Sequence, residues 1–503
     1  MSAESVATGG CLEGLGGRET PYPGRRFGTR RRYTLSLTAS EENHASGTFL
    51  KRLRRDLGSI ESYAVMIGML VGAGIFRVTS VASEATGAGV ILGYLVLAPV
   101  VLATSVSYVV FLSTSLGREP GGEYAYLSAV LGGRRVAFSC AWLKTISYIG
   151  GLAYLAGALA DYGMELLGLE GEALRGAVAL LGLGFFYFVH ISGVRWFGRL
   201  QVWMCAVLGI SILVLVLPGL FAVEKANYTP WFPHGTSGFL SALPPLFFAF
   251  AAFESLAHTA GEVKNSSQRL PGIFLWGITA TALIFVAMTV VAFGVLPADE
   301  LSASVAPMAD VAKQYLPAGA AILVTLGGVV AVATSVNATM LVPARMWIVL
   351  ARDGHLPRWL GYVHAERGTP GSGLTVTCAL AALLLLSGQL LLALNMAVLG
   401  LILVYLLNSW ALLLLPRRNP ELYRQATVAI PPFVQRAAAV ASILGMGVLI
   451  CVQVVQDLSL IGDSTVLERF ENQSTTSIEL LALWSVIGAA IFFGMRSSKG
   501  EGT

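Results

Sequence analysis

The chain contains little charge. Asp, Glu, Lys and Arg make up only 12% of its 503 residues, whereas 55% are hydrophobic and the mean hydropathy is +0.71. Soluble domains average about 25% charged residues. This composition excludes an ordinary soluble domain and predicts an all-α membrane protein with many spans.

Cysteines are also few. Four of the five (Cys140, Cys205, Cys378 and Cys451) fall in apolar runs, so no disulfide framework is predicted. The sequence patterns of serine hydrolases, zinc proteases and P-loop proteins are missing, and no residues show metal-ligand spacing. We therefore expect no enzyme, no resident metal and no cofactor, apart from a coupling sodium ion or proton.

The N-terminal segment lacks an apolar stretch of signal-peptide length. Residues 1–58 are rich in arginine and predict a disordered, basic cytosolic tail. The basic residues are not interleaved with aromatics, which argues against nucleic-acid binding and leaves lipid headgroups as a possible contact.

The rest of the chain predicts twelve spans, because a membrane helix needs about 20 mostly apolar residues. They cover 60–81, 89–113, 136–162, 173–191, 198–222, 239–260, 271–295, 318–350, 372–387, 390–415, 433–456 and 478–495. The ninth is short. An even number places both termini, including residues 496–503, on one side.

Lys and Arg concentrate in cytoplasmic segments of membrane proteins. Most of the 33 here lie on the side of the termini. The opposite side holds only Arg77, Arg175, Lys225, Lys313 and Arg469, and Lys144 lies within a span. Both termini are therefore predicted in the cytoplasm, with the chain in the plasma membrane.

Two spans contain helix-weakening residues. Gly72, Ala73 and Gly74 interrupt the first span, and Pro244 and Pro245 precede small residues in the sixth. Interrupted helices five spans apart are typical of an inverted repeat with a binding site at the membrane midplane. The expected repeats are 59–222 (helices 1–5) and 239–415 (helices 6–10), with 433–495 forming two extra helices.

Four stretches, in order, carry a family resemblance: GAGIF at 72–76, PGGEYAYLSAVLG at 120–132, FFAFAAFESLAHTAGEVKN at 247–265 and ARDGHLPRWL at 351–360. Together they make the chain similar to amino acid permeases of the amino acid, polyamine and organocation (APC) transporter superfamily. The resemblance implies the five-plus-five inverted repeat of the leucine-transporter fold and secondary active transport of an amino acid.

The resemblance also implies a substrate site at the two breaks. Backbone amides of Gly72, Ala73, Gly74 and Ile75 suit a carboxylate, because helix N-termini have free donors. Carbonyls near Phe250 and Ala251 suit an ammonium group, Phe250 would be an aromatic lid, and Ala252 replaces the usual glycine. Glu254 is a costly intramembrane acid, which indicates a functional or network role. His258 is read as a satisfied histidine, and Glu262 as a solvated partner of Lys264 and Arg269.

Coupling has two candidate sites. By resemblance, sodium would be held by carbonyls of Gly68, Val71 and Ala331 and by hydroxyls of Thr334 and Ser335. The fifth-span stretch Val207–Gly209, where related permeases place a lysine, has no charge. The other candidate is Lys144, which lies at a depth similar to Glu254 when about 1.5 Å is counted per residue. Lys144 is either statically paired with Glu254 or titrates in place of a cation.

A small or medium neutral amino acid is the expected substrate, because no second acid beside Glu254 is evident in the broken helices. The alternatives are a cationic amino acid or polyamine transporter, an exchanger, and a sensor that does not transport.

The charge distribution generates a topological prediction. Single cysteines placed at Gly235 and Ser474 in a cysteine-free background should react with an impermeant maleimide added outside intact cells. A tail cysteine that reacts under the same conditions would contradict the predicted orientation.

Overall fold

The computed structural model describes residues 57–118, 121–364, 367–461, 468–469 and 475–500. The predicted tail, residues 1–58, lies almost wholly outside this range, and so do residues 501–503. The described part is built from helices, and its one β-type contact is an isolated bridge between Leu57 and Val263.

Among the described residues, eleven helical segments are long and apolar enough to cross a membrane. They are α1–α2 (Ser59–Phe76), α3–α4 (Val78–Leu112), α6 (Arg134–Leu167), α7 (Glu172–Ser192), α8 (Val194–Gly219), α9–α10 (Gly235–His258), α11 (Ser266–Val295), α14–α15 (Ala318–Arg352), α17 (Leu390–Arg418), α19 (Pro432–Ile461) and α21 (Ser477–Gly500, counted to Met495). The predicted ninth span is α16 (Gly371–Leu386), which has only 16 residues. The structure thus supports eleven of the twelve predicted spans by length. The remaining one, the predicted ninth span, is a shorter apolar helix.

Helices dominate because a backbone in lipid must satisfy its own hydrogen bonds. Shorter helices lie between the spans: α5 (Glu123–Leu131), α12 (Ala298–Ala303), α13 (Pro307–Tyr315) and α18 (Pro420–Arg424). Gly132 ends α5 in a left-handed conformation, with φ of 62°, and α6 begins two residues later. This turn presses α5 against α6, which places the first turn of α5 beside the membrane-embedded part of α6.

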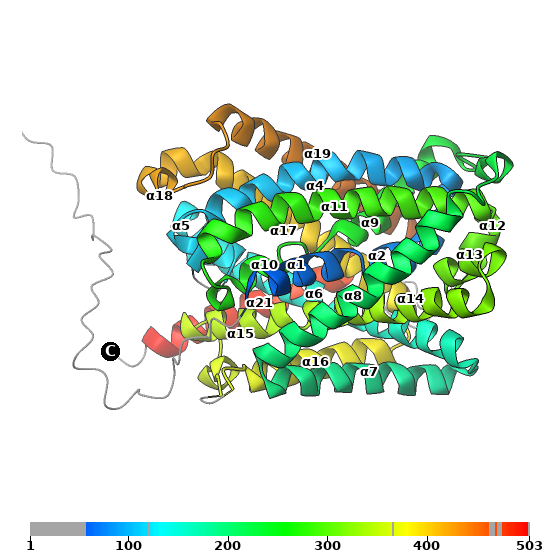
Figure 1. The fold of residues 1–503 in the computed structure, drawn as a ribbon. Helices are drawn as coiled ribbons and strands as arrows, with labels where there is room; N and C mark the ends of the chain where they lie inside the picture. The colour runs from blue at the N-terminus through cyan, green and yellow to red at the C-terminus, as the bar shows by residue number, and fades with distance from the viewer. Residues whose placement is uncertain (1–56, 119–120, 365–366, 462–467, 470–474, 501–503) are drawn as a thin grey trace, which may run out of the picture. The chain divides into compact units, whose positions relative to one another are not determined.

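The first span lies among other helices of the bundle (Figure 1). Helix α1 packs against α8, α11 and α14, while α6 packs against α17 and α14. By contrast, α7, α19 and α21 are mostly exposed, and their outer faces are apolar. Trp276 of α11 is 71% exposed. Such a surface fits lipid rather than water, so the fold is that of a multi-pass membrane protein.

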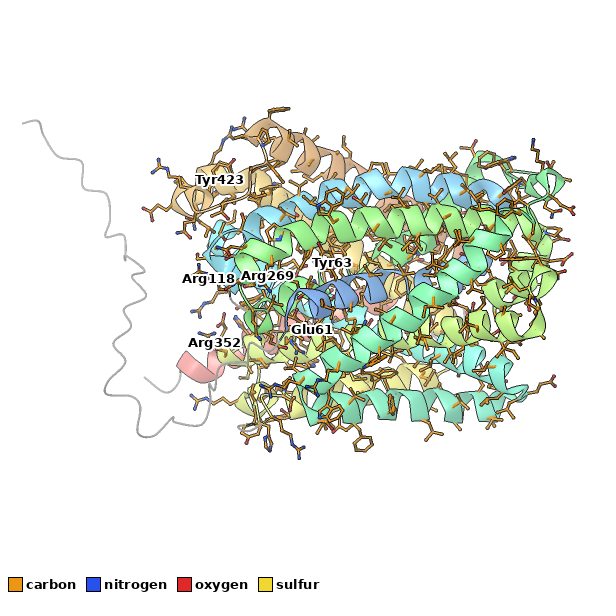
Figure 2. All side chains as sticks on the ribbon, viewed as in Figure 1. Glu61, Tyr63, Arg118, Arg269, Arg352 and Tyr423 are labelled. Atoms are coloured by element: carbon orange, nitrogen blue, oxygen red, sulfur yellow. The ribbon has the colours of Figure 1, made fainter. Side chains whose placement is uncertain are left out.

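One end of the bundle collects basic side chains. Figure 2 shows Arg118, Arg269 and Arg352 at the same end. All three belong to segments that the charge distribution places on the side of the termini. The helix arrangement therefore agrees with the assignment of these three segments to one side of the membrane.

The expectation for Glu262 was wrong. Its side chain is buried rather than solvated, and it accepts two hydrogen bonds from Arg345 of α15, at 2.8 and 2.9 Å. A bidentate guanidinium–carboxylate pair is among the stronger polar contacts. It ties the segment after the sixth span to the end of α14–α15, two elements that are 83 residues apart in sequence.

Removing the carboxylate should destabilise the protein. Glu262→Gln leaves the Arg345 guanidinium buried without its counter-charge, a loss of about 3–5 kcal/mol for a broken buried pair. We expect a lower apparent melting temperature of the purified protein in detergent. Glu300→Gln, at an exposed position, is the matched control. Equal melting temperatures of the two variants would show that the pair contributes little.

Candidate functional site

Both predicted interruptions are present. Helix α1 ends at Leu70 and the chain becomes helical again at Ala73, in α2 (Ala73–Phe76). Helix α9 ends at Phe250, and α10 (Ser255–His258) begins after a four-residue gap. These gaps leave backbone amides and carbonyls without helical partners inside the bundle.

Gly72 has a packing role as well as a conformational one. A β-carbon at this position would lie 1.5 Å from Ser335 Oγ and 2.7 Å from the Ala331 carbonyl oxygen. The backbone of the first break therefore lies directly against α14, at a distance that only glycine permits. The spacing of Gly68 and Gly72 in the sequence is typical of close helix packing, and the structure identifies α14 as the helix that Gly72 approaches.

The second break contains a strained residue. Ala252 has φ of 69°, in the left-handed region that costs a non-glycine residue about 1–2 kcal/mol. Its amide donates a 2.8 Å hydrogen bond to the hydroxyl oxygen of Tyr405 from α17. The positive φ gives a physical reason for the glycine that the family resemblance implies at this position.

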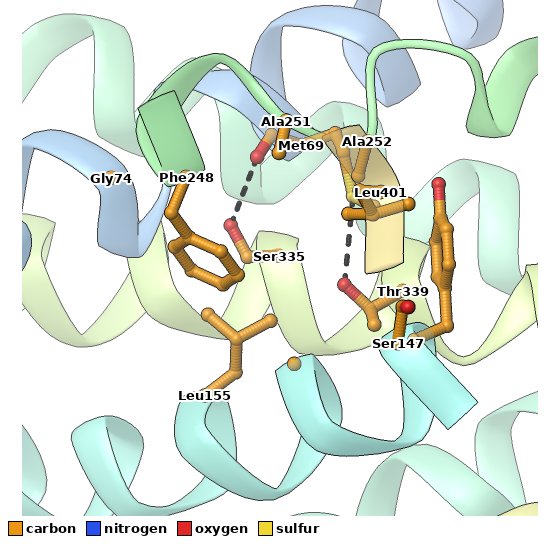
Figure 3. Close-up of a pocket in the computed structure, with 12 residues that line it drawn as sticks. Met69, Gly74, Ser147, Leu155, Phe248, Ala251, Ala252, Ser335, Thr339 and Leu401 are labelled. Carbon is orange, nitrogen blue, oxygen red and sulfur yellow. Dashed lines mark hydrogen bonds between the residues drawn. The ribbon is translucent and has the colours of Figure 1, made fainter. Parts of the chain in front are cut away.

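A small cavity lies where the breaks meet (Figure 3). Its volume is about 30 Å³, and Phe248 and Leu155 face each other across it. Such a space holds about two water molecules. The lining residues are Met69, Gly74, Ser147, Tyr148, Gly151, Leu155, Phe248, Ala251, Ala252, Ser335, Thr339 and Leu401. In the described conformation the cavity therefore has too little room for an amino acid side chain.

The predicted substrate residues divide into two groups. Gly74, Ala251 and Ala252 line the cavity, whereas Gly72, Ile75, Phe250 and Glu254 do not. The backbone of Ala73 begins α2 beside them. The lining residues that sequence reasoning missed come mainly from α6, α14 and α17, whose apolar patterns do not show which face turns toward a cavity.

Phe250 does not have the position expected of a lid. Its buried ring packs against Tyr94 and Phe285, with centroids 5.8 and 4.9 Å away. Phe248, two residues earlier, lines the cavity and meets the edge of Tyr154 at 5.6 Å. In this conformation the phenylalanine of α9 that lines the cavity is Phe248, not Phe250.

The strongest electrostatic feature is a buried ion cluster centred on Lys144. The Lys144 Nζ atom lies 2.5 Å from Glu123 Oε1 and 2.8 Å from Glu254 Oε1. All three side chains are at most 1% exposed. The similar depth predicted for Lys144 and Glu254 is confirmed. Glu123 was missed, although an acid within the largely uncharged PGGEYAY stretch was a usable signal.

Tyrosine hydroxyls complete the cluster. Tyr148 donates a 2.8 Å hydrogen bond to Glu254 Oε1, and Tyr405 donates to the other oxygen of Glu254. Tyr108 donates to Glu123. Helices α4, α5, α6, α17 and the α9–α10 break thus share one polar network, which satisfies the carboxylates that burial would otherwise penalise.

His258 lies against the same cluster. Its Nε2 is 2.9 Å from Glu123 Oε2, and its Nδ1 has no hydrogen-bond partner among the described residues. The expectation of a fully satisfied histidine was therefore wrong. Gly122 makes the contact possible, because a β-carbon there would lie 2.5 Å from the His258 ring.

The cluster carries excess negative charge. Glu123 and Glu254 supply two carboxylates and Lys144 one ammonium, so a neutral His258 leaves one negative charge uncompensated. Burial raises the pKa of Glu123, but Lys144 and His258 outweigh it and hold that pKa well below its usual value. A deeply buried excess charge favours binding of a cation, whereas the lowered pKa of Glu123 disfavours protonation of that carboxylate.

Most of the predicted sodium ligands lie close together. Thr334 Oγ1 lies 2.7 Å from the Gly68 carbonyl oxygen and 2.6 Å from that of Ala331. Ser335 Oγ is 3.4 Å from the Gly68 carbonyl oxygen. The Val71 carbonyl shows no such contact within the described part of the chain. These are hard oxygen donors, which suit a sodium ion, although each hydroxyl is also satisfied by a carbonyl.

The fifth-span position facing this group was predicted in the wrong register. A β-carbon on Gly68 would lie 2.5 Å from Gln201 Nε2 and 2.8 Å from Cys205 Sγ, both on α8. Gly209 instead is exposed, with open space at its β-carbon position. The absence of a lysine opposite the first break still holds, because Gln201 and Cys205 are uncharged.

The comparison with known proteins agrees with this geometry. The sequence model described as amino acid permease matches residues 57–467. The branched-chain amino acid permease BcaP of Bacillus subtilis is 24% identical over 464 residues, covering 88% of this chain and 93% of the relative. The cationic amino acid transporter 9 of Arabidopsis thaliana is 26% identical over 62% of this chain and 58% of the relative. The methylthioribose transporter of B. subtilis is 24% identical, over 76% and 86%.

Two broken helices around a central cavity, in an all-helical bundle, define a membrane transport protein. The family match covers most of the sequence, and the chain belongs to the amino acid permeases of the APC superfamily.

The ion cluster predicts that loss of its lysine destabilises the protein more than loss of one of its acids. Lys144→Met leaves two buried carboxylates facing each other, whereas Glu123→Gln leaves the Lys144–Glu254 pair intact. We expect Lys144→Met to lower the apparent melting temperature much more, by a free energy of about 3–5 kcal/mol.

The double variant Lys144→Met/Glu123→Gln, which removes one charge of each sign, should recover part of that loss. Equal effects of the two single variants would contradict a cluster with excess negative charge.

Proposed function

We propose that this permease is a secondary active transporter that moves a small or medium neutral amino acid by alternating access. The observation that carries the proposal is the cavity at the meeting point of the two broken helices. A zwitterion needs hydrogen-bond donors for its carboxylate and acceptors for its ammonium group. The start of α2 offers amides and the end of α9 offers carbonyls, around a cavity lined in part by Gly74 and Ala251.

The small volume of the cavity supports alternating access. With about 30 Å³ of space, the site admits an amino acid only if helices move apart. In the proposed mechanism, the repeats 59–222 and 239–415 rearrange around the two breaks and open the site to one side at a time. The protein would lie in the plasma membrane with both termini in the cytoplasm.

Neutral substrates are favoured by the uncharged lining of the cavity. None of the twelve lining residues is an aspartate, glutamate, histidine, lysine or arginine. Glu254 lies nearby, but it is hydrogen-bonded to Tyr148 and Tyr405 and paired with Lys144. An apolar lining of Leu155, Phe248 and Leu401 suits an aliphatic side chain, in agreement with the branched-chain specificity in the name of the BcaP relative.

A cationic substrate is the second candidate. Tyr148 lines the cavity and also donates a hydrogen bond to Glu254 of the negatively charged cluster. A movement of this tyrosine would bring a cationic side chain near Glu254, as the name of the Arabidopsis relative suggests. Competition of leucine against arginine, lysine and putrescine for uptake distinguishes the two.

Uptake into proteoliposomes tests the site. A β-carbon on Gly74 would lie 2.5 Å from the Ala249 Cα atom, so Gly74→Leu should push α2 away from α9 and abolish uptake. Gly209→Leu, at an exposed position with open space, should retain it. Normal uptake by Gly74→Leu would refute the site. Saturable substrate binding by the wild type without any uptake would instead indicate a sensor.

Two sites are proposed for the coupling ion, the group of oxygen donors around Thr334 and the ion cluster around Lys144. Sodium would sit among Gly68, Ala331, Thr334 and Ser335; a proton would neutralise the cluster at Lys144. The position of the Lys144 ammonium between the carboxylates of Glu123 and Glu254 supports a static pairing role for Lys144.

Ion replacement separates these mechanisms at a clamped membrane potential. Uptake that requires sodium and loses this requirement in Thr334→Ala supports the oxygen site. Uptake that is independent of sodium and loses its pH dependence in Lys144→Met supports a titrating lysine in the cluster. Stimulation by internal amino acid alone, with neither ion effective, contradicts both and identifies an exchanger.

A further inference from the structure

A second, larger cavity lies away from the substrate site, between α6 and α21. Its volume is about 210 Å³. Helix α6 contributes Arg135, Phe138, Ser139, Trp142 and Leu143, and α21 contributes Ser485, Gly488, Ala489, Phe492 and Phe493. Each set follows the spacing of one helix face. The cavity is therefore a groove that runs along two neighbouring helices.

The groove opens toward the bilayer. Ser139, Ser485 and Ala489 on its walls are exposed, and α21 is the least buried of the spanning helices in the described structure. Its floor is aromatic: the rings of Phe138 and Phe492 lie 5.1 Å apart, and Phe138 stacks on Trp142 at 5.7 Å. Apolar walls with an opening to lipid fit an acyl chain.

One end of the groove is cationic. Arg135 is the second residue of α6, so it lies at the end of the helix that the charge distribution places at the cytoplasmic surface. Its guanidinium lies 6.0 Å from the centroid of Phe493. No carboxylate of the described residues lies within ion-pair distance of Arg135. An exposed guanidinium without a counter-charge suits a phosphate.

We propose that this groove binds one anionic phospholipid of the cytoplasmic leaflet, with its phosphate on Arg135 and an acyl chain between α6 and α21. Basic pockets between membrane helices on this side bind acidic lipid headgroups. The site is independent of the proposed transport reaction, because none of its residues lines the substrate cavity.

The bound lipid would strengthen a narrow helix contact. Helix α21 is fastened to α6 by Trp142 and Trp484, whose rings stack at 4.4 Å. Each indole N–H donates to the other residue's carbonyl, at 2.8 and 2.9 Å. Trp142 is also two residues before Lys144. A lipid that fills the groove supports this contact and, through α6, the ion cluster.

Native mass spectrometry of the delipidated protein tests the proposal. The probe is an equimolar mixture of phosphatidylglycerol and phosphatidylcholine with identical acyl chains, added in detergent. We expect the wild type to retain one phosphatidylglycerol with a preference of roughly fivefold, the ratio for a single basic contact. Arg135→Gln should abolish the preference.

Two further variants make the test specific. Arg134→Gln removes a neighbouring charge that does not line the groove and should keep the preference, whereas Ala489→Phe fills the groove and should lose the bound lipid. Equal loss in Arg134→Gln and Arg135→Gln would refute the site in favour of general surface attraction.

A wild type without headgroup preference would also refute the proposal. A dimer mass that disappears in Ala489→Phe, with no lipid retained by the wild type, would assign the groove to a second copy of the chain. None of these outcomes depends on uptake activity, so the experiment tests the lipid site separately from the transport function.

Discussion

The position of Lys144 between Glu123 and Glu254 constrains much of the structure. An ion in a membrane bundle is stable only when counter-charges and hydrogen bonds replace water. Here the replacement draws on α5, α6, the α9–α10 break, α4 and α17. Any rearrangement that opens the central cavity must keep this network satisfied or exchange its partners, which links the electrostatics to movement.

The need of polar groups for partners inside the membrane also explains the broken helices. A helix interior uses all its backbone groups, so it has none to offer a polar substrate; an interruption releases some of them. Gly72 lies against α14, and Ala252 is tied by its amide to Tyr405, a member of the ion cluster. The second break thus belongs to the charge network through Glu254, which pairs with Lys144, and through Tyr405, which bonds both Ala252 and Glu254.

Sequence patterns predicted features that depend on local composition. The run of apolar residues defined nearly all the spans, and α16 was foreseen as short. Glycine and small residues located both breaks, and counting residues at helical rise placed Lys144 level with Glu254. They failed where a side chain's direction mattered: Phe250 was taken for the residue at the cavity, where Phe248 lies, and the fifth-span register was displaced from Gln201 and Cys205 to Val207–Gly209.

What the sequence alone determined was the solvent of the protein and the helices that follow from it, because burial in lipid imposes length, composition and closed backbone bonding on each segment. The tertiary structure decided which polar residues meet. Glu123 and His258 are 135 positions apart, and Glu262 pairs with Arg345, which is 83 positions away. Such pairs depend on helix rotation and packing angle, which are set by contacts between distant segments and leave no periodic signal along the chain.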